Sequence, residues 1–327
     1  MITQPSAVLA PTPLVVSVPP GRHIELADGQ RLSLESLSLE ALLALQGQQE
    51  PRFAKKIAAS RKDSAEREQL IRTAYASVCA ILDEQAKRRD VAGVFSMGMD
   101  PRYAELVLKL CRAQQCRGLK GGLFELGCSA GSLLGQADRA GFRVGGLEVV
   151  PELLRRAKEQ VSTRHHDNLF LGDFRRVDLS RQLQSFSVAY WNDVFEHIPT
   201  DEISDYLSRL YDLLEPGGLL VTITPNWHMR PSDVTMNFRP PRSEAEGFHL
   251  KEYTLGEVCR LLRGVGFTEI ATPSFISRRR IYLYRLFGLT GLKCILEPLL
   301  EYLPYPCAVQ ACRRFGLSCT IATKPRA

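Results

Sequence analysis

The stretch Phe124-Glu125-Leu126-Gly127-Cys128-Ser129-Ala130-Gly131-Ser132 decides the fold of this 327-residue chain. It follows the start of a short apolar run and opens a pattern typical of a helix. Glycine at 127 lets the backbone turn sharply after a strand, and glycine at 131 lets a ligand approach the start of the helix. Two glycines alone do not distinguish a ligand-binding loop from a tight structural turn, so the spacing of later residues has to decide.

The region after residue 121 alternates short apolar runs with helical patterns. This alternation predicts an α/β fold: a Rossmann-like, doubly wound and mostly parallel sheet of seven strands, with an N-terminal helical extension and a helical insertion before the last strand. Such sheets bind ligands at the carboxyl ends of their strands. The expected strands are Leu123–Leu126, Arg143–Val149, Asn168–Leu171, Phe186–Trp191, Leu219–Thr224, Thr268–Ser274 and Leu317–Thr323.

Polar side chains follow three of these expected strands. Glu148 lies at the end of the second strand, where its carboxylate can accept hydrogen bonds from both ribose hydroxyls of a nucleoside. Asp173 follows the third strand and can accept from an exocyclic adenine amine, while Phe174 can stack near the base. The fourth strand closes with Asn192-Asp193-Val194-Phe195-Glu196-His197, which sets polar and titratable groups at the same edge of the sheet.

The first 120 residues are predicted to hold a tail with a small extension (1–60) and a helical cap or support (61–120). The rest, 121–327, is the expected catalytic domain, with 277–314 as an inserted helical segment on the acceptor side. The N-terminal elements expected are a hairpin of His23–Leu26 and Gln30–Leu34, a short helix over Leu37–Leu45, a helix capped by Asp63 with Glu66, and a helix starting at Asp100-Pro101.

Composition bounds the classes of function. The formal charge of +6 and the pI of about 8.8 are too weak to indicate nucleic-acid binding without a concentrated patch. Prolines interrupt the first twenty residues, which predicts a loosely packed tail and not a secretory signal, and no stretch is apolar enough to span a bilayer. The nine cysteines contain no C-x-x-C pair and are expected to be free thiols in a reducing cytoplasm.

The motifs in order are ELGCSAG, LEVV, GDF, NDVFEH and EPGG, and together they resemble the class I S-adenosylmethionine-dependent methyltransferases. The chain is most similar to the branch that contains the ubiquinone-biosynthesis O-methyltransferases. The resemblance covers Gly121 to Pro325, broken by 277–314. Ser129 departs from it, because the family's donor loop usually has glycine there. A dinucleotide dehydrogenase is the competing interpretation, but it needs G-x-G-x-x-G, which Gly127-Cys128-Ser129 does not supply.

This resemblance implies S-adenosylmethionine as cofactor and assigns residues to its site. His197 is the expected general base, with Asp193 beside it, although a structural role in the following turn is an alternative for His197. A second alternative is a divalent metal, magnesium or calcium, held by Asp193, Glu196 and His197 as in a similar E-x-x-E-H segment of the branch. The expected cofactor-binding residues are Glu125, Gly127, Cys128, Ser129, Gly131, Glu148, Val149, Asp173, Phe174, Asn192 and Val194.

The acceptor is expected to be a small molecule methylated on oxygen: a phenol, a quinone precursor, a sugar or a natural-product hydroxyl. Methylation of carbon or nitrogen, on a small or lipid-linked acceptor, and a non-catalytic nucleoside-binding scaffold remain alternatives, although the segment at Asn192 lacks the prolines of N-P-P-Y enzymes. His228, His249 and Tyr253 are expected to be structural or lid residues. The arginines and aromatics of 277–314 could grip an anion, rest on a membrane or cover the sheet; a homodimer is also compatible, and no nucleic acid is expected.

Overall fold

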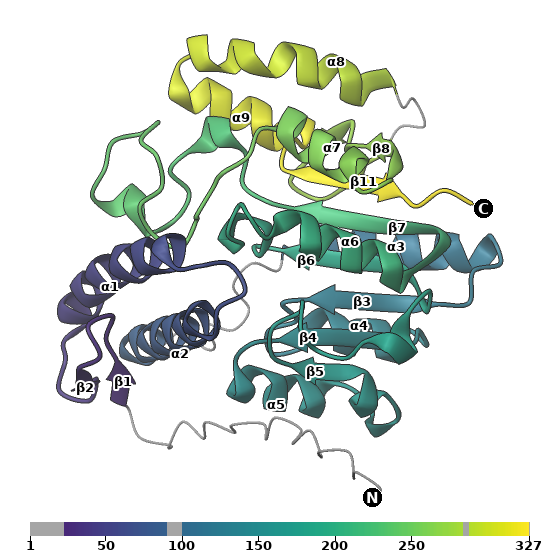
Figure 1. Cartoon of the computed structure of the whole chain (residues 1–327). Helices are drawn as coiled ribbons and strands as arrows, with labels where there is room; N and C mark the ends of the chain where they lie inside the picture. The colour runs from purple at the N-terminus through teal and green to yellow at the C-terminus, as the bar shows by residue number, and fades with distance from the viewer. Residues whose placement is uncertain (1–22, 90–99, 284–287, 327) are drawn as a thin grey trace, which may run out of the picture.

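The computed structural model describes residues 23–89, 100–283 and 288–326 (Figure 1). The proline-rich tail predicted at the N-terminus lies outside the described residues. The strands are β1 His23–Glu25, β2 Arg31–Ser33, β3 Gly122–Leu126, β4 Val144–Glu148, β5 Leu169–Leu171, β6 Phe186–Asn192, β7 Leu214–Ile223, β8 Thr268–Ala271, β9 Phe275–Ile276, β10 Ile281–Tyr282 and β11 Cys319–Thr323. The main helices are α1 Leu39–Ala59, α2 Ala65–Arg88, α3 Pro101–Cys116, α4 Ser132–Arg139, α5 Pro151–Gln160, α6 Ile203–Leu213, α7 Leu255–Gly264, α8 Gly288–Leu296 and α9 Tyr305–Phe315.

A seven-stranded sheet in the order β5-β4-β3-β6-β7-β11-β8 forms the centre of the molecule. The five strands from β5 to β7 are parallel, whereas β11 runs antiparallel to both β7 and β8. The predicted Rossmann-like fold, mostly parallel with seven strands, is therefore confirmed. Since β3 to β7 run parallel, their carboxyl ends meet at one edge of the sheet, and that edge faces α1 and α2 (Figure 1).

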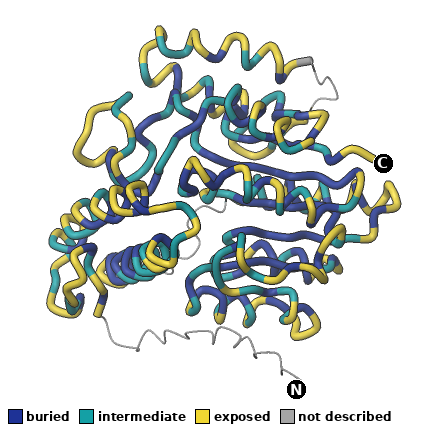
Figure 2. Tube along the Cα trace, viewed as in Figure 1, coloured by how far each residue is buried: buried dark blue, intermediate teal, exposed yellow. Residues whose placement is uncertain are grey.

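The strands are buried because helices cover both faces of the sheet (Figure 2). One core joins the sheet to α6 and α7, with Trp191 and Phe195 among its largest side chains. The other joins the opposite face to α3, α4 and α5. Leu214–Ile223 starts earlier than expected, because the Glu215-Pro216-Gly217-Gly218 turn forms an irregularity inside β7: Phe186 pairs with Leu214, and Val188 pairs with Leu219.

The N-terminal elements follow the prediction in kind but not in their bounds. The β1–β2 hairpin and the start of α3, capped by Asp100, are as expected. The short helix predicted over Leu37–Leu45 is wrong in length, because α1 continues to Ala59 through Pro51. The predicted N-cap Asp63 is also wrong: its φ is +60°, and the Ser64 side chain accepts the hydrogen bond from the Arg67 N–H instead.

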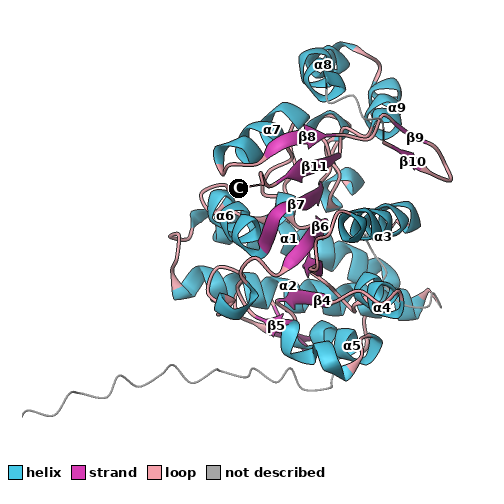
Figure 3. Ribbon diagram, turned by 90° about the vertical axis from the view of Figure 1, so that its right-hand side faces the viewer, coloured by secondary structure: helices cyan, strands magenta, loops and turns pink. Residues whose placement is uncertain are grey.

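The predicted helical insertion lies between β8 and β11. It begins with the β9–β10 hairpin and continues through α8, the 3₁₀ helix η7 Glu297–Tyr302, and α9. Figure 3 places α8, α9 and the hairpin together at one end of the molecule. Among the residues that the structure describes, no helix combines the length and the apolar composition needed to cross a membrane.

Candidate active site

The donor loop, residues 127–131, connects β3 to α4 with three residues in the left-handed backbone region. These are Gly127 (φ +73°), Ser129 (φ +48°) and Gly131 (φ +78°). Ser129 thus occupies a conformation that favours glycine, which explains why glycine is usual at this position of the resembling family. Gly131 has a packing reason as well: a Cβ there would lie 2.7 Å from the Cα of Ala157 in α5. The absent side chain therefore lets α4 approach α5, a role that the sequence did not indicate.

Glu148 ties the donor loop to the end of β4. One carboxylate oxygen accepts the backbone N–H of Ser129 at 2.8 Å, and the other accepts those of Val149 at 2.8 Å and Val150 at 3.1 Å. Burial raises the pKa of Glu148, and these three backbone N–H groups oppose that effect. The carboxylate is thereby fixed beside the loop at the carboxyl edge of the sheet.

Glu125 and Cys128 lie close behind the loop. Both are buried, and burial together with the Glu148 carboxylate raises the pKa of Glu125 well above its usual range. One carboxyl oxygen of Glu125 has no hydrogen-bond partner among the described residues. Val194 lies against the turn, because a Cβ on Gly127 would come within 2.5 Å of its Cγ2 atom. The structure therefore brings Glu125, Gly127, Cys128, Ser129, Glu148, Val149 and Val194 together.

The segment after β5 differs from the prediction. Asp173 accepts from Arg175 at 2.8 Å and from the Tyr206 hydroxyl at 3.3 Å, so its carboxylate is already paired. Phe174 is 1% exposed, and its ring faces Phe124 and Tyr206 in the core. We correct the assignment of Phe174 from base stacking to core packing, since its ring is not available to a ligand.

The end of β6 turns abruptly through Asp193, whose φ is +58°. The turn places Asp193 at the surface, with 51% of its side chain exposed, and buries Glu196 completely in the 3₁₀ helix η4 Phe195–His197. Burial and the neighbouring Asp193 carboxylate raise the pKa of Glu196 well above its usual range. Neither carboxyl oxygen of Glu196 has a hydrogen-bond partner among the described residues. Asn192 lies just before this turn and is partly buried.

Two histidines face each other across this turn. The ring of His197 lies 4.9 Å from the ring of His249, and its Nδ1 bonds the Phe248 carbonyl at 2.9 Å. The Nδ1 of His249 bonds the Glu252 carboxylate at 3.1 Å, and its Nε2 lies 4.0 Å from Asp193. With Nδ1 occupied in both rings, the Nε2 atoms are left for chemistry.

The surroundings push the pKa values of the two histidines apart. Burial and the positive charge of His249 lower the pKa of His197. Burial opposes the charge of His249, but the hydrogen bond to Glu252 and the carboxylates of Glu196, Asp233 and Asp193 raise its pKa above the usual value. We call Asp193, Glu196, His197 and His249 the histidine cluster; one ligand atom from each lies within 4.8 Å of all the others.

His249 is a residue of this cluster that the sequence does not assign to the catalytic group. The sequence predicts a structural or lid residue there, after the fifth expected strand. The structure brings it to His197 through a loop in which the Lys251 N–H bonds the Glu196 carbonyl at 3.2 Å. No spacing pattern in the sequence links these two segments.

Helix α2 lies directly against the histidine cluster. The Tyr75 ring is 5.9 Å from that of His197 and 5.1 Å from that of Phe248. On the same helix, the buried Arg67 binds Glu202, which precedes α6, at 2.7 Å. These contacts place the N-terminal helices over the carboxyl edge of the sheet, where the sequence left covering and supporting roles open.

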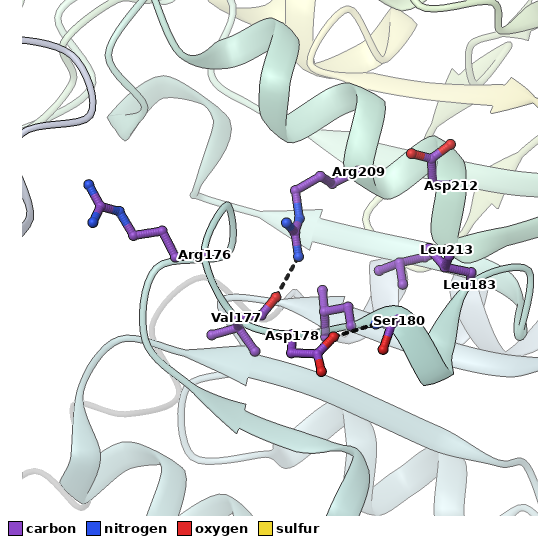
Figure 4. Close-up of a pocket in the computed structure, with 9 residues that line it drawn as sticks. Arg176, Val177, Asp178, Ser180, Leu183, Arg209, Asp212 and Leu213 are labelled. Atoms are coloured by element: carbon purple, nitrogen blue, oxygen red, sulfur yellow. Dashed lines mark hydrogen bonds between the residues drawn. The ribbon is translucent and has the colours of Figure 1, made fainter. Parts of the chain in front are cut away.

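A hollow of about 440 Å³ lies elsewhere, between the segment after Asp173 and α6 (Figure 4). The Arg209 guanidinium reaches across it and donates to the Val177 carbonyl at 2.6 Å. None of its lining residues belongs to the donor loop or to the histidine cluster. This hollow is therefore distinct from the predicted donor site.

Known proteins resemble the strand–loop–strand part of this site. Residues 124–220 match the family model of a methyltransferase domain. A curated relative, the carboxy-S-adenosyl-L-methionine synthase of Chromohalobacter salexigens, is 29% identical over 106 residues, which are 30% of this chain and 38% of the relative. The chain thus matches less than half the length of that relative.

Solved structures with a similar arrangement share little sequence. A methyltransferase from Archaeoglobus fulgidus has 17% identity and a TM-score of 0.43 over 68% of this chain and 94% of its own. A phosphoethanolamine N-methyltransferase from Haemonchus contortus has 17% identity and a TM-score of 0.42 over 68% and 52%. The 1,6-didemethyltoxoflavin-N1-methyltransferase of Burkholderia thailandensis has 18% and 0.41 over 74% and 86%.

Proposed function

We propose that this chain, whose residues 124–220 match the family model of a methyltransferase domain, is a class I S-adenosylmethionine-dependent methyltransferase that transfers a methyl group from S-adenosylmethionine to an oxygen of a small molecule. The observation that carries the proposal is the Glu148 carboxylate, buried and fixed by three backbone N–H groups beside the donor loop. The oxygen that accepts only the Ser129 N–H keeps a lone pair, which can accept a ribose hydroxyl of the donor. The similarity to the ubiquinone-biosynthesis branch stays a prediction.

The donor would lie along the carboxyl ends of β3, β4 and β6. We assign Glu125, Gly127, Cys128, Ser129, Val149, Asn192 and Val194 to its surroundings, with Glu148 on the ribose. The assignment of Asp173 to the adenine amine stays a prediction, and it requires Asp173 to keep a lone pair beside its Arg175 ion pair. Of residues 61–120, helix α2 would cover the bound donor and exclude water, because its Tyr75 already packs on the cluster, whereas α3 packs on a face of the sheet.

His197 is the base that we assign to the reaction. Its Nδ1 donates to the Phe248 carbonyl, so the neutral ring carries a lone pair on Nε2. In the step, the acceptor oxygen forms a bond to the methyl carbon while the carbon–sulfur bond breaks, and the hydroxyl proton passes to His197 Nε2. Asp193 lies at the mouth of the cluster, half exposed, where it can orient the acceptor or its proton.

Donor binding is tested by titration calorimetry with S-adenosylmethionine and with its demethylated product. We expect both to bind, and Glu148→Ala to weaken binding by about a hundredfold, because a buried charge-assisted interaction is lost. Glu152→Ala is the matched control, since this acid lies four residues on and pairs with Arg155 and Arg156 at the surface. Absence of binding by the unaltered chain, or unchanged affinity in Glu148→Ala, would contradict the donor site.

A second function for the histidine cluster is favoured by one observation. Each histidine gives its Nδ1 to an oxygen, the Phe248 carbonyl or the Glu252 carboxylate, which is the arrangement that orients metal-ligating imidazoles. The buried Glu196 carboxyl without a partner fits the same interpretation. With His249 included, two imidazoles and two carboxylates suit zinc, manganese or iron better than the magnesium or calcium expected from the sequence.

The two functions of the cluster give opposite results with chelators. If His197 acts as the base, methyl transfer survives dialysis against EDTA, His197→Ala lowers turnover more than donor affinity, and mass spectrometry finds no stoichiometric metal. If the cluster binds a divalent cation, EDTA abolishes activity, added zinc or manganese restores it, and His249→Ala removes the bound metal. Donor affinity is measured in parallel, so loss of the cofactor site is recognised separately.

A further inference from the structure

An apolar stripe runs along the outer side of the inserted segment. It consists of six exposed side chains on α8, η7 and the turn after them: Leu292, Ile295, Leu296, Leu299, Tyr302 and Leu303. Their spacing follows the three- and four-residue steps of one helical face. Ile295 is 73% exposed and Tyr302 87%, and Figure 2 shows this segment running along the outer edge of the molecule. We call these six residues the outer stripe.

The same segment directs its acidic side chains toward the protein. Glu297 is 3% exposed; it accepts the Asn226 side chain at 2.7 Å and the Leu255 N–H at the start of α7 at 2.7 Å. Glu301 accepts from Arg230 at 2.7 Å and bonds His228 at 3.0 Å. A surface helix normally exposes its charges, whereas this segment binds both of its acids to protein groups and exposes six apolar side chains. It is therefore held firmly in place with its apolar side toward the outside.

The fully exposed charged side chains of the inserted segment are positive. Glu297 and Glu301 are the acids of residues 288–316, and both are bound to groups of the protein interior or its adjacent loop. Arg278, Arg279 and Arg280 at the tip of the β9–β10 hairpin are exposed, as are Arg313 and Arg314 at the end of α9. Arg314 lies 5.3 Å above the Phe275 ring of β9, which joins the two groups of arginines to one surface.

We propose that the outer stripe and these arginines form a docking surface for a membrane that contains anionic lipids. Leucine, isoleucine and tyrosine side chains enter the boundary between headgroups and acyl chains, and the arginines contact headgroup phosphates. A second copy of the chain fits less well, because a two-fold contact presents the same patch again, and both acids of that patch are already bound within the protein. A nucleic acid would leave the apolar side chains in water.

This surface is linked to the candidate active site through the loop after β7. Glu301 holds Arg230 and His228 of that loop, and Asn226, at its start, is bound to Glu297 and bridges to Tyr253. Docking would thus act on the segment that holds the loop after β7 in place. The docking proposal does not depend on methyl transfer, because it rests on the insertion alone.

Flotation of the full chain with lipid vesicles tests the proposal. We expect binding to vesicles of phosphatidylcholine mixed with phosphatidylglycerol and much weaker binding to pure phosphatidylcholine. The double variant Leu292→Asp/Ile295→Asp should bind about a hundredfold more weakly. The triple variant Arg278→Ala/Arg279→Ala/Arg280→Ala should lose about tenfold or more. The matched control is Leu43→Asp/Leu183→Asp, which places charges at exposed leucines elsewhere and should bind like the unaltered chain.

Three outcomes would overturn the proposal. The first is that the unaltered chain does not bind anionic vesicles. The second is that the control and Leu292→Asp/Ile295→Asp bind equally well. The third is that the chain does not bind vesicles but forms a dimer in light scattering, which Leu292→Asp/Ile295→Asp abolishes. Circular dichroism shows whether each variant folds. If the aspartate variant does not fold, the triple arginine variant is used to test the proposal, because the three arginine side chains are exposed and their removal should not affect folding.

Discussion

The donor loop takes its contacts from neighbouring parts of one sheet edge, whereas the histidine cluster gathers groups from segments far apart in the sequence. Residues 127–131 follow β3, Glu148 is the last residue of the neighbouring strand β4, and the Ser129 hydrogen bond joins them. The cluster takes its groups from the turn after β6 and from the loop at His249, and Tyr75 of α2 packs on it. The proposed donor site thus depends on short-range backbone geometry, and the proposed acceptor site depends on long-range packing.

The largest loss of stability is expected from a substitution at Gly131, in the donor loop. Gly131→Ala forces a Cβ to within 2.7 Å of the Ala157 Cα while φ stays at +78°. Overpacking against a backbone atom and left-handed strain add, so we expect the free energy of unfolding to fall by about 4 kcal/mol. Urea denaturation measures this change, and donor affinity in the folded fraction should fall as well.

Gly141→Ala separates the two causes at Gly131. Gly141 has a similar φ of +86°, but nothing lies within 4 Å of a Cβ built on it. We expect a loss of only about 1 kcal/mol there, from strain alone. Equal losses in the two variants would show that close packing of α4 on α5 does not contribute, and that the donor loop is less constrained than its geometry indicates.

Sequence alone predicted the sheet that carries the proposed donor site, because the signals for it are local. Glycines, a strand-end acid and the alternation of strands and helices lie within short windows, and the predicted sheet is confirmed. The positive φ of Ser129 could not be read directly, since serine rarely takes that conformation; the departure from the family's glycine was the only sign of it.

The features that the sequence did not predict depend on packing between distant segments. His249 reaches His197 only because the chain returns over the sheet edge after β7, and Phe174 faces the core because Phe124 and Tyr206 surround it. The length of α1 was missed because Gln49, Glu50 and Pro51 interrupt its apolar pattern, although Glu50 is buried in the folded protein. Propensity and periodicity do not contain such tertiary contacts.

Glu50 of α1 offers a pH-dependent test on the acceptor side. Burial raises the pKa of Glu50 to about 7, with Asp233 adding to the effect, while Gln46, the Phe248 backbone and His249 oppose it. The folded protein therefore binds this proton more tightly than the unfolded chain does. Stability from this group is present below pH 4.5, is lost as the pH rises from there to about 7, and stays lost above.

We expect Glu50→Gln to stabilise the protein at pH 8 by about 2 kcal/mol and to change little at pH 4. Thermal or urea unfolding at the two pH values measures the difference. Glu244→Gln, at an exposed carboxyl, is the control and should give no such contrast. A Glu50→Gln variant that is destabilised at both pH values would show that the carboxylate is needed to hold α1 over the loop of His249.

The smallest change in stability is expected at Ser129, also in the donor loop. Ser129→Gly removes a side chain from a residue with φ +48° and keeps the backbone N–H that donates to Glu148. Relief of left-handed strain exceeds the extra freedom of glycine in the unfolded chain, so we expect a gain of about 0.5 kcal/mol in the free energy of unfolding. Donor affinity should stay the same, because the contact to Glu148 comes from the backbone.

Ser132→Gly, in the exposed first turn of α4, is the control. It should lose about 0.5 kcal/mol in the free energy of unfolding, since helical backbone there gains nothing from glycine. A drop in donor affinity for Ser129→Gly alone would mean that the serine hydroxyl contacts the donor. The donor site would then depend on a side chain as well as on backbone geometry.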